Sequence, residues 1–185
     1  MIRFADKDDL SAVIKIHTDS LKNDMLPRLG IRIMLAYYKK LLKDNYIIAY
    51  EKDNRIFGFL ALTVYSTGTL KFILHNFWLF FVKFIQHPDL LMQTIWMAIP
   101  SRNIKYKYPE ISFIAIDRTC RKLGIGSNLI NFACHFLSNK DYKYIQVRTD
   151  SKNAISNQFY KKNEFVHVSA EKRFNRMLNI YLREV

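Results

Sequence analysis

Cysteine is scarce in this chain, and its scarcity excludes two classes of protein. The 185 residues include two cysteines, Cys120 and Cys134, and five histidines that do not cluster. A disulfide framework needs several paired cysteines, and a structural zinc site needs close-spaced ligands. We therefore expect no disulfide and no bound metal. The N-terminus lacks a basic stretch followed by an apolar core, so we expect a cytoplasmic protein.

Acidic residues are also few, which gives the chain a strong positive charge. Asp and Glu number 16, against 29 Lys and Arg, for a formal net charge of +13. Such a field attracts anionic partners, such as a phosphorylated small molecule or an anionic membrane surface. No basic run is dense enough to indicate nucleic acid. A generally basic protein without an anionic partner is the other interpretation.

Glycine and proline number five and four, and the chain has no repeat and no low-complexity tract. Half of the residues are hydrophobic and 15% are aromatic, which is enough for a buried core. A chain of 185 residues with this composition fits one domain. We therefore expect a single domain over residues 1–185.

Two of the five glycines stand in the most informative stretch, Arg121 to Gly126. An apolar, strand-like segment precedes it at 111–116, and a helical pattern follows at 127–137. Glycine permits a left-handed backbone conformation, and it lets a ligand approach the backbone closely. A helix N-terminus presents unpaired N–H groups and partial positive charge, which suit a phosphate. The stretch indicates either a phosphate-binding turn or a purely structural one.

The glycine spacing narrows the kind of phosphate ligand. A dinucleotide-binding turn would have a third glycine where Leu129 stands, and a nucleoside-triphosphate loop would end in Gly-Lys-Ser or Gly-Lys-Thr. The pattern Arg-x-x-Gly-x-Gly between a strand and a helix instead resembles the turn with which GNAT acetyltransferases hold the pyrophosphate of coenzyme A.

A second stretch, residues 153–165, supports the resemblance. The residues that fit the second signature of the GNAT superfamily are Asn153, Ser156, Phe159, Tyr160 and Phe165. Glu164 stands where the family usually has glycine, which puts the geometry of this turn in doubt. The resemblance extends over nearly the whole chain, apart from about 67–109.

The resemblance implies the GNAT fold, an α/β fold with a mixed, mostly antiparallel sheet of about seven strands flanked by helices. Periodicity and turn residues predict strands at 2–4, 46–50, 56–65, 111–116, 144–147, 165–168 and 174–182. They predict helices at 10–17, 31–42, 127–137 and 153–161, and a loop at 23–30.

The segment 67–109 departs from the resemblance, and we expect an extra apolar helical insert between the third and fourth strands. A helical pattern from Leu70 to His87 gathers its polar residues on one arc and has a continuous apolar face, Leu70–Ile85. A second helix follows at 89–98. The charged residues argue against a membrane span. This face would pack over the protein's own sheet or acceptor pocket, form a homodimer, or contact a membrane surface.

The resemblance implies acetyl-coenzyme A as co-substrate and assigns roles to particular residues. Tyr160 would give a proton to the departing thiolate. Ile114 and Ile116 would line the thioester, and the N–H of Ile116 would polarise its carbonyl. Asn153 would bind the pantetheine arm or steady the strand beside it. The pyrophosphate would be held by Arg121, Lys122, Leu123, Gly124, Ile125, Gly126 and Ser127.

The general base stays open at this point. Glu110 and Asp117 flank the strand before the turn, and His75 and His167 are further candidates. An amine that arrives partly deprotonated would need no base beyond a water path. His17 falls on the apolar face of its helix, so we expect it to be packed rather than catalytic.

The activity implied is transfer of an acetyl group from acetyl-coenzyme A to the primary amine of a small acceptor. The positive charge and the apolar insert favour a phosphorylated or lipid-linked amino sugar. The alternatives are a protein or peptide N-acetyltransferase and a non-catalytic acyl-coenzyme A sensor. We expect a cytoplasmic enzyme, with contact at the inner membrane surface as a further hypothesis and no nucleic-acid partner.

Overall fold

A computed structural model describes residues 1–22, 24–65, 68–98, 108–173 and 175–185. Seven strands form one sheet in the order β1-β2-β3-β4-β5-β7-β6, and every neighbouring pair is antiparallel except β4 and β5. The strands are β1 (Ile2–Phe4), β2 (Tyr46–Lys52), β3 (Arg55–Thr63), β4 (Glu110–Ile116), β5 (Tyr144–Asp150), β6 (Val166–Arg173) and β7 (Arg176–Glu184). The predicted fold class is confirmed.

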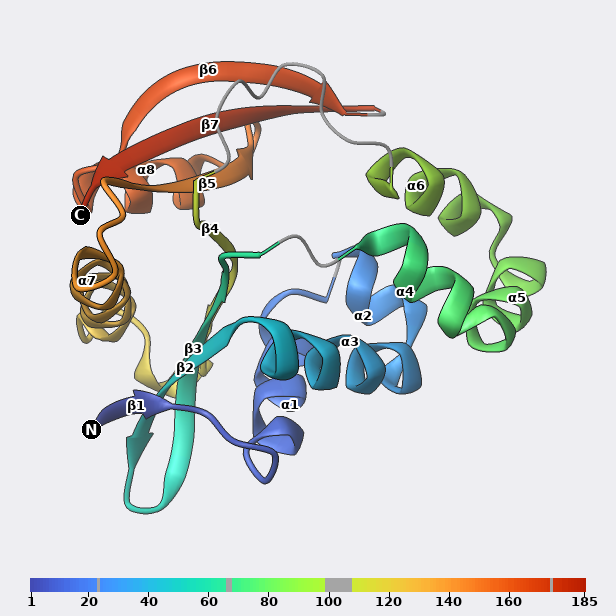
Figure 1. The fold of residues 1–185 in the computed structure, drawn as a ribbon, viewed down its shortest axis with the longest axis horizontal. Helices are drawn as coiled ribbons and strands as arrows, with labels where there is room; N and C mark the ends of the chain where they lie inside the picture. The colour runs from blue at the N-terminus through green and yellow to red at the C-terminus, as the bar shows by residue number, and fades with distance from the viewer. Residues whose placement is uncertain (23, 66–67, 99–107, 174) are drawn as a thin grey trace.

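Helices cover the two faces of this sheet (Figure 1). Those before β4 are α1 (Leu10–Ser20), α2 (Met25–Leu29), α3 (Ile31–Asp44), α4 (Thr69–His75), α5 (Phe77–Gln86) and α6 (Pro88–Ala98). Those after β4 are the short 3₁₀ helix Arg118–Cys120, α7 (Ile125–Ser138) and α8 (Ala154–Lys162). In Figure 1, α1 to α6 lie on one side of the central strands and α7 on the other.

The core is divided into two clusters by the alternation of side chains along the strands. In β3, Phe59 and Ala61 pack with α1 and α3, whereas Leu60 and Leu62 pack with α7. Successive residues of a strand point to opposite faces, so a strand that is apolar on both faces is covered by helices on both sides. This explains why β3 reads as a continuous apolar run.

Two helical predictions need correction. The predicted loop at 23–30 contains the short helix α2, whose residues Leu26 and Leu29 are buried. The predicted continuous helix from Leu70 is two helices, because it breaks at Asn76, whose side chain bonds to the carbonyl of Phe72 at 2.9 Å. Asparagine side chains compete with helical hydrogen bonds in this way.

Three helices, α4 to α6, occupy the described part of the segment between β3 and β4. One side of this segment packs on the core through Phe72, Phe80 and Leu90. That the segment is an addition to the GNAT fold stays a prediction. No helix in the described part of the chain is both long and apolar enough to span a membrane.

Candidate active site

The parallel strands β4 and β5 separate at the centre of the sheet. They pair at Glu110 with Gln146 and at Ile111 with Val147, and in the described residues the pairing ends there, while β4 continues to Ile116. A shift in the register with β3 accompanies the separation: Ala61 pairs with Phe113, but Leu62 pairs with Ile111, so Ser112 is an extra residue. Such a bulge increases the local twist of a strand.

The N–H groups of Ile114 and Ile116 point into this gap. At the other edge of β4, the N–H of Asp117 donates to the carbonyl of Phe57 at 2.7 Å. Alternate residues of an antiparallel strand direct their N–H groups to opposite edges, so Ile114 and Ile116 face β5. The carbonyl of Ile116 accepts bonds from Ser20 Oγ and Arg121 Nε, both at 3.2 Å. An N–H beside a gap suits the oxygen of a polarised carbonyl.

The predicted turn joins this strand to α7. Gly124 precedes the helix in the left-handed region, with φ of 78°, and no described side chain caps it. The N–H groups of Ile125, Gly126 and Ser127 therefore have no partner within the helix. Together with the helix dipole they favour an anion at this point.

The residues before Gly124 complete the turn at the surface. Arg121 is exposed, and its bond to Ile116 places the guanidinium between the end of β4 and the turn. Lys122 has a positive φ of 63° and Leu123 is exposed. The structure therefore brings the predicted pyrophosphate residues together at one end of the gap.

Tyr160 lies in α8, within the core cluster that also contains Ile111 of β4 and Val147 of β5. Burial raises the pKa of its phenol above the ordinary value, and the negative charge of Glu110 raises the pKa further. The hydroxyl therefore keeps its proton at neutral pH. Within the described part of the chain, no group is hydrogen-bonded to this hydroxyl.

Asn153 caps α8, since its side-chain oxygen accepts a bond from the N–H of Ser156 at 3.1 Å. The neighbouring Asn157, which the sequence analysis did not single out, is buried and more connected. Its amide donates to the carbonyl of Asn153 at 2.7 Å and accepts from the hydroxyl of Tyr181 at 2.8 Å. It also ties α8 to β7 through Asn179 at 3.0 Å.

The candidate bases differ in their surroundings. Both carboxylate oxygens of Glu110 bind Arg148, at 2.9 and 2.6 Å, and one also accepts from Gln146 at 2.9 Å. Asp117 accepts two bonds from Thr119, which hold the pKa of its carboxyl below the usual value. The bonds from Thr119 favour the ionised form of Asp117.

Two histidines among the candidates are exposed, His75 at the end of α4 and His167 in β6. His17 is fully buried, as expected, and its Nδ1 lies 2.5 Å from the hydroxyl of Tyr38. Burial lowers the pKa of His17 to about 4, so the ring is neutral at pH 7.

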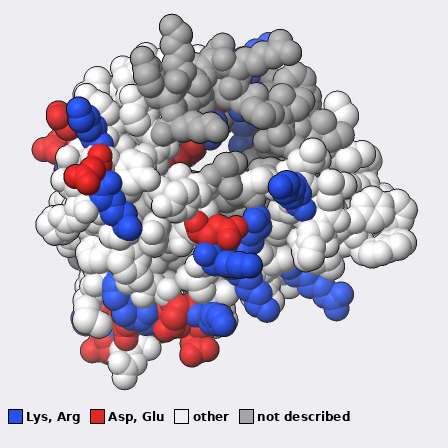
Figure 2. Space-filling view, viewed as in Figure 1, with Lys and Arg blue, Asp and Glu red and all other residues white. Residues whose placement is uncertain are grey.

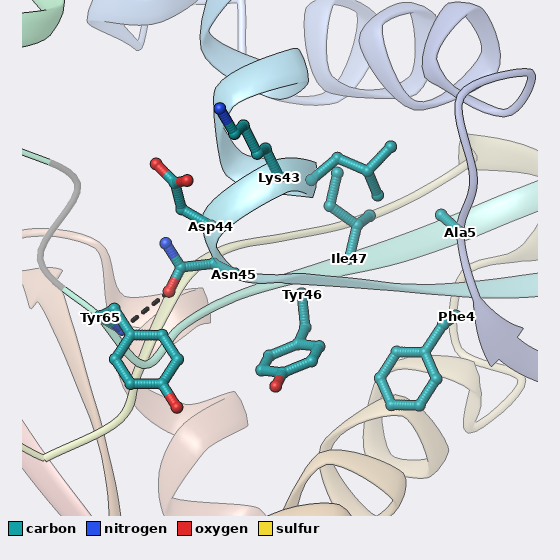
Figure 3. A pocket seen from close by; sticks show the side chains of 9 residues that line it. Phe4, Ala5, Lys43, Asp44, Asn45, Tyr46, Ile47 and Tyr65 are labelled. Carbon is teal, nitrogen blue, oxygen red and sulfur yellow. Dashed lines mark hydrogen bonds between the residues drawn. The ribbon is translucent and has the colours of Figure 1, made fainter.

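A surface hollow of about 450 Å³ lies away from this gap, at the edge formed by β1 and β2. Tyr46, Tyr65 and Phe4 direct their rings to one side of it, while Lys43 and Asp44 point to the other (Figure 3). Its polar groups do not converge on one point, as they do in most ligand sites. We therefore take the gap between β4 and β5 as the candidate active site.

A family model described as the acetyltransferase (GNAT) family matches residues 18–165. The chain belongs to the GNAT family. Its members transfer an acetyl group from acetyl-coenzyme A, so the expected family, the N-acetyltransferase activity and the co-substrate are confirmed. No curated protein matches this GNAT sequence.

Solved structures share the GNAT fold with this chain. An N-acetyltransferase from Staphylococcus aureus Mu50 is 19% identical, over 100% of this chain and 97% of its own, with a TM-score of 0.63. Ard1 from Thermoplasma volcanium is 15% identical, over 100% and 97%, with a TM-score of 0.66. An enzyme from Bacillus anthracis, provisionally named a streptothricin acetyltransferase, was solved in complex with acetyl-coenzyme A. It is 17% identical, over 76% of this chain and 62% of its own, with a TM-score of 0.50.

Proposed function

We propose that residues 1–185 form one GNAT domain whose active site is the gap between β4 and β5. The observation that carries this proposal is geometric. The unpaired end of β4 at Ile116, the uncapped start of α7 at Ile125 and the protonated hydroxyl of Tyr160 belong to three adjoining elements. They offer, in turn, an N–H for the thioester carbonyl, a site for the pyrophosphate and a proton for the sulfur.

The chemistry assigned to these residues follows from their protonation. The acceptor nitrogen forms a bond to the acetyl carbon, and the bond from that carbon to sulfur breaks. Tyr160 holds a proton that it gives to the departing thiolate, while the N–H of Ile116 stabilises negative charge on the carbonyl oxygen. The proton lost by the amine leaves through water. Asn153 keeps the start of α8, and with it Tyr160, in place.

We propose a phosphorylated or lipid-linked amino sugar as the acceptor. The net charge of +13 favours an anionic acceptor over a cationic polyamine. The wall beside β4 is aromatic: Tyr37 of α3 contacts Phe113 of β4 and Phe72 of α4, at ring distances of 6.1 and 6.2 Å. The apolar helices therefore adjoin the strand that carries the acetyl group.

Release of the coenzyme A thiol over a panel of amines tests this proposal. The panel contains a nucleotide-linked amino sugar, the same sugar without phosphate, a polyamine and a peptide with a free N-terminus. We expect the highest kcat/KM with the phosphorylated sugar and a lower value for its phosphate-free form. A preference for the peptide would show a protein acetyltransferase, and acetyl-coenzyme A binding without turnover on any amine would favour a sensor.

A further inference from the structure

The helices α4 and α5 have apolar side chains on two sides. The rest of the protein covers one of these sides. Phe72 and Phe80 are buried, and Ile73, Leu79 and Phe84 pack against the same core cluster. This accounts for part of the predicted Leu70–Ile85 face. The remaining apolar side chains face solvent, and we call them the α4–α5 surface: Leu70, Leu74, Phe77, Trp78, Phe81, Val82 and Ile85.

The α4–α5 surface is unusual in the size of its exposed side chains. Trp78 is 73% exposed, Ile85 69% and Leu74 63%. Three of its rings form a cluster, with Phe81 stacked on Phe77 at 5.6 Å and edge-on to Trp78 at 5.9 Å. A contiguous patch of this kind marks an interaction site rather than ordinary surface.

The helical segment that carries this surface has few charged residues, and more of them are basic than acidic. Within 68–98 the charged side chains other than histidine are Lys71, Lys83 and Asp89. Asp89 is paired with Arg28 at 2.5 Å, whereas Lys71 is exposed. In Figure 2 the atoms over α5 at the right margin are white, and blue side chains lie beside them.

We infer that the α4–α5 surface docks on the surface of an anionic lipid bilayer. Aromatic and leucine side chains beside lysines are the composition of helices that lie in the membrane interface. Tryptophan favours the membrane interface because its ring is apolar and its N–H stays near water. The helices form an outer margin of the molecule in Figure 1, with the two termini on the opposite side.

A second copy of this chain fits the same surface less well. A symmetric dimer would bring two +13 chains together at one interface, and like charges repel. An anionic bilayer is instead attracted by this net charge. The inference does not depend on which amine the enzyme acetylates.

Sedimentation of the full-length protein with vesicles tests the inference. We expect binding to phosphatidylglycerol vesicles, weaker binding to phosphatidylcholine vesicles, and loss of binding at high salt. The test variant carries Leu74→Glu and Trp78→Glu. The control carries Val166→Glu and Val168→Glu, which add the same charge at two exposed apolar positions of β6.

The affinity of the test variant for phosphatidylglycerol vesicles should be lower than that of the wild type by a factor of about ten or more. The reason is that two large apolar side chains no longer enter the membrane interface. The control variant should bind nearly as the wild type does. The chain has two tryptophans, so a Trp96→Phe variant leaves the fluorescence of Trp78 alone, and its emission should shift to shorter wavelength on the vesicles.

Three results would overturn the inference. One is a wild-type protein that does not bind anionic vesicles. Another is equal loss of binding in the test and control variants, which would show a bulk charge effect. The third is a wild-type dimer that becomes monomeric in the test variant while vesicle binding is unchanged, which would assign the surface to a second copy. Thermal unfolding confirms that both variants are folded.

Discussion

The ring of Phe159 in α8 lies directly against Gly126 at the start of α7. A methyl group on Gly126 would stand 3.0 Å from Cζ of this ring and 3.2 Å from Cε2. At Gly124 a methyl group would meet no atom within 4 Å, but φ is 78°, which side chains disfavour. Gly126 therefore permits the packing of two helices, and Gly124 sets the direction of the backbone and leaves open space before the turn.

This difference predicts different effects for the two glycines. Gly124→Leu should abolish most of the affinity for acetyl-coenzyme A, because its side chain would enter the space that we assign to the pyrophosphate. Gly126→Ala should cost about 1–3 kcal/mol of unfolding free energy, because Phe159 must move. Calorimetric titration and denaturant unfolding measure the two quantities. Wild-type affinity in a folded Gly124→Leu variant would remove the pyrophosphate from this turn.

Glu164 adopts a left-handed backbone, with φ of 64°, at the position where GNAT sequences usually have glycine. Such a conformation costs a non-glycine residue about 1–2 kcal/mol. Its exposed carboxylate pairs with Arg183 at 2.9 Å, a contact that contributes little in water. Glu164→Gly should therefore raise the unfolding free energy by about 1 kcal/mol.

The control for this prediction is Glu164→Ala, which removes the same ion pair but keeps a side chain in the left-handed region. It should be no more stable than the wild type. Denaturant unfolding compares the three proteins. A glycine variant that is less stable than the alanine variant would show that the left-handed conformation at this turn carries no cost.

Buried His17 predicts a particular loss of stability in acid. Its pKa is lowered to about 4 in the folded protein from 6.5, so the unfolded chain takes up the proton first. The unfolding free energy should therefore fall as pH decreases from about 6.5 to about 4, by a maximum of about 3 kcal/mol. Below that window the folded protein is protonated too, and this contribution changes no further.

A His17→Gln variant isolates the histidine from the carboxylates that titrate in the same range. Glutamine stays neutral, so the variant should lose less stability than the wild type between pH 6.5 and 4, even if it is less stable at pH 7. Parallel curves for the two proteins would mean that His17 is not the group responsible.

Much of the backbone geometry of the candidate site could be predicted because its features are local. The Arg121–Gly126 turn needs its glycines and the strand and helix on either side, and the structure has all of them. The seven strands could be predicted from hydrophobic alternation and turn residues, because both are properties of residues close together in the sequence. The pKa of Tyr160 could not be predicted, because it depends on burial and on Glu110, which is distant in sequence.

The features that the sequence analysis missed depend on contacts that sequence periodicity cannot show. The pattern from Leu70 onward is helical throughout, yet Asn76 bonds to the carbonyl of Phe72 and the helix breaks there. Asn157 could not be singled out from the sequence, because its partners, Asn179 and Tyr181, come from β7. A single helical wheel also could not show that α4 and α5 bury one apolar side and expose the other.

The turnover of Tyr160→Phe against acetyl-coenzyme A and its best amine tests the central claim most directly. The variant keeps the ring and loses the hydroxyl, so kcat should fall by about 10²–10⁴-fold while the affinity for coenzyme A changes little. Tyr181→Phe is the matched control, since it removes a buried hydroxyl that bonds to Asn157, and its kcat should stay close to the wild-type value. A Tyr160→Phe enzyme that keeps most of its kcat would contradict the account, because Tyr160 would then be structural and the departing thiolate would need no proton from it.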